Sequence, residues 1–383
     1  MPELQKQGKY RIVRVGNFTG KDEWYYSDME LAPEKYCDDG DLLFKWACTF
    51  GPEYWHGEKS IYHYHIWKVV VNDLLMDKDY LYYYLKLMTP KWLCATNGST
   101  MVHLTKETME NEIVSFPSSL GVQKAVASTL RLLDDAIENN SSICSDLEAT
   151  AKLLYDYWFV QFDFPDENGK PYKSSGGKMV WNDELKREIP AGWSCVQLGR
   201  IAEYVGDSIS NNLLDSNSYI STDNMVSNRG GVVQSQFVPK IGSSTRFRPG
   251  DVLLSNIRPY FKKIWCADRI GGCCNDVLVL RPILRDYAML CYWTMRSDSF
   301  FAYDMAGSKG SKMPRGDKNH ILQYPVALPQ KNEKIAADFD KIANLVEINV
   351  SQLRANNSQL VELRDFLLPL LMNGQVTIGD DDK

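Results

Sequence analysis

The sequence lacks the features of a membrane or secreted protein. None of its apolar runs approaches the roughly 18 residues that a membrane-spanning helix requires. The polar start MPELQKQGKYRIVR has no signal-peptide or transit-peptide pattern. The nine cysteines form an odd, scattered set without a Cys-x-x-Cys pair, which favours reduced thiols over a disulfide framework. We therefore expect a cytoplasmic protein, long enough at 383 residues for about two domains.

Motifs of the common enzymes are also absent. The sequence has no Walker-type Gly-rich loop, no His-Glu-x-x-His, no Gly-x-Ser-x-Gly and no Asn/Asp-Pro-Pro-Tyr/Phe signature of amino-methyltransferases. Its five histidines are scattered; His63 and His65 would share one face of a strand, where packing or a hydrogen bond is favoured over a metal site. Asp166 and Glu167, followed by Lys170, resemble a nuclease pattern, although they lie in a Pro/Gly-rich connector. We expect no catalysis and no metal, with a nuclease as the alternative.

Charge is distributed unevenly along the chain. The net charge is −6, yet residues 193–330 contain 16 Lys and Arg against 11 Asp and Glu. Residues 1–118 contain 13 against 17. The second half therefore contains a basic domain, of the kind that binds an anionic partner.

The chain repeats itself at an offset of 207 to 212 residues. GDLLF at 40–44 corresponds to GDVLL at 250–254, DYLYYYLKLM at 79–88 to DYAMLCYWTM at 286–295, and EIVSFP at 112–117 to HILQYP at 320–325. Chance similarity rarely keeps so constant an offset, so we infer a tandem duplication.

Each repeat ends in a long helical pattern with apolar residues at 4,3 spacing, which is typical of a coiled-coil seam. Two long core helices of a bundle are the alternative. Asn140 and Asn349 fall at matching positions, where a buried amide commonly fixes register. The predicted seam is Val126, Leu130, Leu133, Ile137, Asn140, Leu147 and Leu154 in the first helix, and Ile335, Phe339, Ile342, Val346, Asn349, Leu353, Leu360, Leu363 and Leu367 in the second.

These patterns predict an α+β protein with two tandem, pseudo-symmetric α/β domains and two long helices packed as an antiparallel coiled coil. At 1.5 Å per residue, each helix spans roughly 50 Å and could separate two ligand-binding units. The expected division is 1–118 for the first domain, 119–162 for the first helix, 163–192 for a connector, 193–330 for the second domain, 331–373 for the second helix and 374–383 for a tail.

Basic and aromatic residues gather in the second domain, and lysine and arginine on loops suit contacts with DNA phosphates and guanine edges. In the first domain the candidates come from the repeat rather than from charge. The predicted DNA-binding residues are Arg246, Arg248, Arg258, Lys262, Lys263, Lys309, Lys312 and Arg315, with Lys45, Lys59, Asn97 and Ser99 in the first domain. A solvated, charged surface is the alternative for each residue.

The sequence resembles the DNA specificity subunits of type I restriction-modification systems over almost its whole length. The resemblance lies in YDYWFVQFDFPDENGKPYKSSGGKMVWNDELKREIPAGW (155–193), GDVLLSNIRPYFKK (250–263), YPVALPQKNEKIA (324–336) and LRDFLLPLLMNGQV (363–376). It implies two target-recognition domains that each read one half of a split site in double-stranded DNA, with paired helices as the spacer. It also implies a subunit without catalytic activity.

The resemblance further implies partners. Two methyltransferase subunits would dock on the helices and connector (roughly 121–162 and 331–372), and motor-nuclease subunits would join them. S-adenosylmethionine, Mg and ATP would then bind only to those partners, and this chain would need no cofactor.

The second domain opens with EIPAGWSCVQLGRIAEYV (188–205), whose counterpart in the first domain would precede residue 1. Three explanations stay open: a start inside an ancestral reading frame, completion by another segment or chain, or a naturally shorter domain. A scaffold that binds the methyltransferase without reading DNA is therefore a further hypothesis. The final Asp-Asp-Asp-Lys resembles a tag, or a natural acidic tail.

Overall fold

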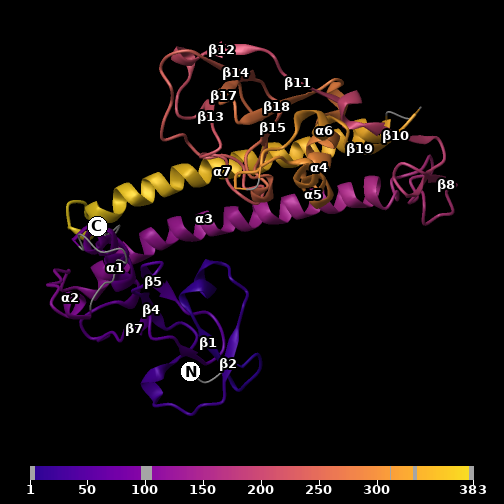
Figure 1. The fold of residues 1–383 in the computed structure, drawn as a ribbon. Coiled ribbons are helices and arrows are strands. Elements are labelled where there is room, and N and C mark those ends of the chain that lie inside the picture. Colours follow the sequence, from indigo (N-terminus) through magenta and orange to yellow (C-terminus); the bar gives the residue numbers. More distant parts are fainter. Residues whose placement is uncertain (1–4, 96–105, 311, 331–333, 379–383) are drawn as a thin grey trace. The chain divides into compact units, whose positions relative to one another are not determined.

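The computed structural model describes residues 5–95, 106–310, 312–330 and 334–378 (Figure 1). The chain forms two compact units. Unit 1 comprises residues 1–139 and 356–383, and unit 2 comprises residues 140–355. The division falls inside the two long helices, α3 (Leu120–Tyr155) and α7 (Lys334–Met372), so each unit contains part of both. The domain boundaries expected from the sequence stay a prediction.

Unit 1 contains two small sheets, ordered β2-β1-β6-β3 and β5-β4-β7. The apolar run of β4 is buried on both faces, since Leu43 packs into one core and Leu42 and Phe44 into another. The elements are β1 (Tyr10–Val13), β2 (Tyr25–Ser27), β3 (Tyr36–Cys37), β4 (Leu42–Lys45), β5 (Gly51–Tyr54), β6 (Ser60–Tyr62), β7 (Ile66–Lys68), α1 (Lys78–Ala95) and α2 (Lys106–Glu110).

Unit 2 contains two four-stranded sheets, β11-β18-β15-β16 and β12-β14-β17-β13, and the two-stranded pairs β10-β19 and β8-β9. Its elements are β8 (Met179–Asn182), β9 (Arg187–Pro190), β10 (Trp193–Gln197), β11 (Ala202–Tyr204), β12 (Ser208–Ser210), β13 (Tyr219–Ile220), β14 (Ser243–Phe247), β15 (Val252–Ser255), β16 (Ile264–Cys266), β17 (Gly271–Cys273), β18 (Val277–Pro282), β19 (Pro325–Pro329), α4 (Ala288–Arg296), α5 (Asp298–Gly307) and α6 (Lys318–Leu322).

The strand pairings repeat between the units. The antiparallel pair β4 and β7 aligns Phe44 with Trp67, and β15 and β18 align Leu254 with Leu278. The parallel pair β1 and β6 has the counterpart β13 and β17. Two long helices combined with small sheets confirm the predicted fold class, and the matching registers support the duplication.

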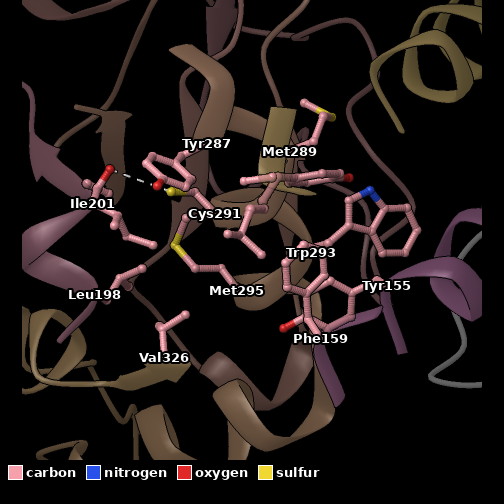
Figure 2. Packing of buried hydrophobic residues seen from close by; sticks show 14 of the residues in the cluster. Tyr155, Phe159, Leu198, Ile201, Tyr287, Met289, Cys291, Trp293, Met295 and Val326 are labelled. Atoms are coloured by element: carbon pink, nitrogen blue, oxygen red, sulfur yellow. Dashed lines mark hydrogen bonds between the residues drawn. The ribbon is translucent and has the colours of Figure 1, made fainter. Parts of the chain in front are cut away.

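Unit 2 has a strand layer without an equivalent in the described part of unit 1. Strand β10 pairs with β19, and β11 pairs with β18. Between them, Leu198 and Ile201 pack against α4, where the Cys291 Sγ contacts the Ile201 carbonyl oxygen at 3.6 Å (Figure 2). The effect is visible at one repeated position: Ile321 is fully buried in unit 2, whereas Ile113 of unit 1 is 88% exposed.

Within each unit, α3 and α7 run antiparallel. In unit 1, Arg364 forms an ion pair with Asp134 at 2.8 Å, and Asn357 donates to the Ile137 carbonyl. In unit 2, the Cys144 Sγ lies 3.8 Å from the Val350 carbonyl oxygen. Further along the pair, the rings of Tyr155 and Phe339 lie 6.1 Å apart.

The predicted seam requires correction along α7. In α3 the buried or half-buried positions follow the prediction, from Val126 to Leu154. In α7 the buried stripe moves one residue toward the C-terminus after Phe339, because Ala343 and Val350 are buried while Ile342 is 45% exposed. The later buried or half-buried positions on this stripe are Arg354, Asn357, Val361, Arg364 and Leu368. Of the predicted positions, Val346, Leu353, Leu360 and Leu367 are half-buried, whereas Asn349 is exposed and Leu363 is 44% exposed.

The matched asparagines therefore do not form a pair of register-fixing amides. Asn349 is exposed, and its Nδ2 donates to the Leu345 carbonyl of its own helix at 2.7 Å. The shift of the buried stripe along α7 also has a polar cause. Arg354 and Arg364 reach Glu148 and Asp134 from the shifted stripe, so ion pairs form one residue beyond the expected Leu353 and Leu363.

Candidate nucleic-acid interface

Three loops of unit 2 are joined by backbone hydrogen bonds into one surface, which we call the three-loop surface: residues 226–231, residues 256–263, and residues 308–310 with 312–317. The amides of Asn228 and Arg229 donate to the carbonyls of Phe261 and Lys262 at 2.8 and 2.9 Å. The Arg258 amide donates to the Pro314 carbonyl at 2.8 Å, and the Gly316 amide to the Asn256 carbonyl. The loops therefore hold one another in place.

Left-handed backbone is concentrated on this surface. Asn228, Arg229, Arg258 and Lys262 all have φ between +51° and +66°. Such conformations in residues other than glycine cost of order 1 kcal/mol each and are retained where surrounding structure enforces them, often at functional sites. Pro259 begins the single 3₁₀ turn between two of these residues and presents Tyr260, which is 47% exposed.

The structure brings together most of the predicted cations that follow β15. Lys262 pairs with Asp298 at 2.6 Å, Lys309 with Asp317 at 2.6 Å, and Arg315 with Asp276 at 3.1 Å. The Lys309 and Lys312 side chains are exposed. The Lys263 ammonium donates to the Thr222 carbonyl at 2.6 Å, so one of its hydrogen bonds fixes the backbone at Thr222. An incoming anion would therefore have to displace or join the carboxylates that pair with Lys262, Lys309 and Arg315.

Other predicted residues do not join this surface. Arg248 precedes β15 and Arg258 follows it, so the arginines that are close in sequence lie at opposite ends of a buried strand. Arg246 lies in β14, in the other four-stranded sheet. The predicted basic cluster is therefore divided by the fold: Arg246 and Arg248 are exposed, but away from the three loops.

In unit 1, Lys45 has to be withdrawn as a phosphate contact. Its side chain is only 8% exposed, and its ammonium pairs with Glu53 at 2.9 Å across β4 and β5. Lys59 is exposed and lies 4.7 Å from the Tyr36 ring centre. The predicted Asn97 and Ser99 lie outside the described residues. The His63 and His65 rings lie 4.8 Å apart, and burial lowers the pKa of His63.

Sequence reasoning missed Arg229. The Asn-Arg-Gly-Gly turn indicates a loop, and a cation within a turn is its only signal of function. The Arg229 side chain is 21% exposed, its Nε donates to the Arg296 carbonyl, and its guanidinium lies 5.5 Å from the Phe301 ring centre. The guanidinium is thus held rigidly beside Lys262, with which it shares Asp298.

Asp166 has a structural explanation. Its carboxylate accepts hydrogen bonds from the backbone amides of Asn168 and Lys170 at 2.8 and 2.9 Å, which closes a turn of the connector. Among the residues that the structure describes, no three His, Cys, Asp or Glu side chains are grouped as a metal site would need. No helix in the same residues is long and apolar enough to cross a membrane.

A buried carboxyl group supports the third loop and gives a pH-dependent prediction. Asp304 of α5 is fully buried, neither of its oxygens has a partner in the described part of the chain, and burial raises its pKa to about 6. A Cβ at Gly316 would lie 2.5 Å from Asp304 Oδ1 and 2.9 Å from Asn256 Oδ1. Glycine is therefore needed where this loop crosses the two side chains.

Because the folded pKa of Asp304 is raised, the protonated form stabilises the fold at low pH. This contribution decreases as pH rises from about 4 through about 6. We expect Asp304→Asn, which cannot ionise and whose amide can donate to Asn256, to raise the free energy of unfolding by about 1–3 kcal/mol at pH 7. Urea unfolding at pH 4 and pH 7 checks this; an equal effect of the substitution at both values would contradict it.

Comparisons with known proteins give a consistent result. Residues 2–149 match the family described as type I restriction modification DNA specificity domain. The type I restriction enzyme MjaIX specificity subunit of Methanocaldococcus jannaschii is 35% identical over 125 residues, which cover 32% of this chain and 27% of that relative. The EcoDI specificity subunit of Escherichia coli is 21% identical over 332 residues, 80% of this chain and 72% of the relative.

A solved structure shares the fold. The S subunit of a type I restriction-modification system from M. genitalium aligns with a TM-score of 0.57 at 15% identity, covering 96% of this chain and 90% of that one. At this identity the likeness concerns the fold alone.

Proposed function

We propose that this chain, like the type I restriction-modification specificity subunits to which it is similar, reads a bipartite DNA site and scaffolds the methyltransferase and motor-nuclease subunits, without catalysing a reaction itself. The observation that carries the DNA-reading part is the three-loop surface of unit 2. Turns there present Lys262, Lys309 and Arg315 beside the exposed rings of Tyr260 and Phe261. This combination suits contacts with phosphates and base edges.

Reading of a second half-site by unit 1 is supported by the repeated strand pairings rather than by charge. The loop after β4 has the same position in its sheet as the loop after β15. In place of Arg258 and its neighbours it presents Trp46, stacked on Trp67 with ring centres 5.6 Å apart. If unit 1 reads DNA, its contacts are therefore more aromatic and less cationic than those of unit 2.

Scaffolding is supported by apolar side chains that the helix pair leaves exposed. In unit 2 these include Ile342, Leu345 and Ile348 of α7, which are 44–60% exposed. In the connector, Trp181 is 61% exposed and borders a surface pocket of about 430 Å³, where the Arg187 guanidinium lies 4.6 Å from the Phe162 ring centre. Exposed apolar stripes and tryptophan–arginine groups are typical of protein interfaces.

Selection of DNA by the assembled complex tests the proposal. The chain is co-purified with its methyltransferase, and bound duplexes from a randomised pool are sequenced. We expect two short conserved blocks about one helical turn apart. A single block would mean that one unit does not read DNA, and the absence of any block would favour the scaffold that binds only protein. Failure to co-purify would contradict the scaffolding role.

A further inference from the structure

One carboxylate on the three-loop surface neutralises two cations. Asp298 Oδ1 lies 2.5 Å from Arg229 Nη2 and 2.6 Å from Lys262 Nζ. The two cations hold the pKa of Asp298 down at about 2, so it is ionised at neutral pH. The Asp298 side chain is 71% exposed, whereas those of Arg229 and Lys262 are 21% and 32% exposed. The anion therefore covers the cations from the solvent side.

The two cations are fixed, and their counter-ion is the most exposed member of the group. Lys262 and Arg229 both have left-handed backbone, and the Arg229 amide donates to the Lys262 carbonyl. The Arg229 Nε is bonded to the Arg296 carbonyl at 2.6 Å, so the guanidinium points Nη2 at Asp298 from a fixed position. By contrast, among the residues that the structure describes, the Asp298 carboxylate has no hydrogen-bond or ion-pair partner other than these two cations. An incoming anion could thus replace Asp298 without disturbing the cations.

We propose that Arg229 and Lys262 form a binding site for one phosphodiester group of DNA, and that Asp298 occupies this site as an internal counter-ion in the free chain. The proposal rests on the DNA-reading function proposed above. An ionised phosphate oxygen accepts the same two charge-assisted hydrogen bonds as a carboxylate oxygen. Binding to any duplex then requires displacement of Asp298.

Such a counter-ion favours specific over indiscriminate binding. Lys309 with Asp317 and Arg315 with Asp276 are two further cation–carboxylate pairs on the same surface, although in each of them the cation is the more exposed member. A duplex that makes only phosphate contacts has to compete with these carboxylates. A duplex that also makes base contacts has an additional favourable contribution to its binding free energy. Carboxylates that weaken the contribution of the phosphate contacts therefore raise the ratio of specific to non-specific affinity.

The substitution Asp298→Asn tests the proposal, because asparagine keeps the size of the side chain and removes its charge. In the full chain with its methyltransferase, we expect the affinity for an arbitrary duplex to rise about three- to tenfold at 0.1 M salt. We expect the slope of log affinity against log salt to steepen by about 0.9–1.8, since phosphate binding to one or both cations is no longer offset by the release of an ionised carboxylate. Asp286→Asn, an exposed carboxylate elsewhere in unit 2, has the same charge change and should alter the affinity less than twofold.

A second variant separates a local effect from a general one. Adding Lys262→Gln to Asp298→Asn should abolish the rise in affinity for an arbitrary duplex. A rise in affinity that persists in the double variant would overturn the proposal. Unchanged or reduced affinity of a folded Asp298→Asn variant, as judged by thermal unfolding, would overturn it too. If the native complex selects a DNA motif while Asp298→Asn has no effect, only the present inference fails; if neither protein binds DNA, the proposed function fails with it.

Discussion

Replacement of Lys262, Lys309 and Lys312 with glutamine is expected to lower DNA affinity about a hundredfold at physiological salt. Each lost phosphate contact removes about 0.9 from the slope of log affinity against log salt, so three contacts remove about 2.7. The three lysines lie on the loops that the structure joins, and two of them are exposed. Fluorescence anisotropy with a selected duplex between 50 and 300 mM salt measures both quantities.

A matched triple variant controls for net charge. Lys21, Lys35 and Lys91 are exposed lysines of unit 1 that lie outside the predicted interface. Their replacement with glutamine changes the total charge equally. It should change the slope of log affinity against log salt by less than about 0.9, the value for one phosphate contact. Equal slopes for the two triple variants and the native chain would exclude the three-loop surface as a phosphate-binding site.

Phe339→Ala is expected to give the largest loss of stability, about 3–5 kcal/mol, because it removes a fully buried ring and leaves a cavity. The Phe339 ring lies 5.1 Å from that of Phe159 and 6.2 Å from that of Trp158, where α7 packs against the end of α3. The free energy of unfolding in urea, followed by tryptophan fluorescence, measures the effect.

Phe366→Ala is the control on the same helix. Its side chain is 65% exposed, so we expect a change within about 0.5 kcal/mol. A comparable loss of stability from both variants would mean that the exposed stripe of α7 contributes as much packing energy as the inner one, which would contradict the assignment.

These two phenylalanines show how far apolar periodicity predicts a seam. Spacing alone located α3 and α7 and identified Ile335 and Phe339 correctly. Beyond them it was right only in part: Val346 and Leu367 pack against the cores, but Ile342 and Leu363 are exposed, because α7 has apolar residues on two adjacent stripes. The choice between the stripes depends on Ala343, Val350 and on arginines that pair with α3, and a pattern of hydrophobic residues does not contain those partners.

The candidate interface shows a similar division. The repeat predicted which strands correspond, and loop chemistry predicted Lys262, Lys309 and Arg315. Arg229 was missed because its importance comes from a contact 33 residues away, with Lys262, that only the fold creates. Lys45 was assigned by analogy with the basic repeat, but a glutamate on the neighbouring strand holds its charge in the interior of unit 1.

The antiparallel pairing of α3 and α7 also determines the order in which the protein can be completed during synthesis. The contact of Cys144 with Val350 joins residues 206 positions apart, and that of Asp134 with Arg364 joins residues 230 apart. At roughly 5–20 residues per second, α3 waits about 10–45 s on the ribosome for its partner. The core of unit 1 contains Leu368, Leu371 and Met372. The unit that emerges first is therefore the last to close.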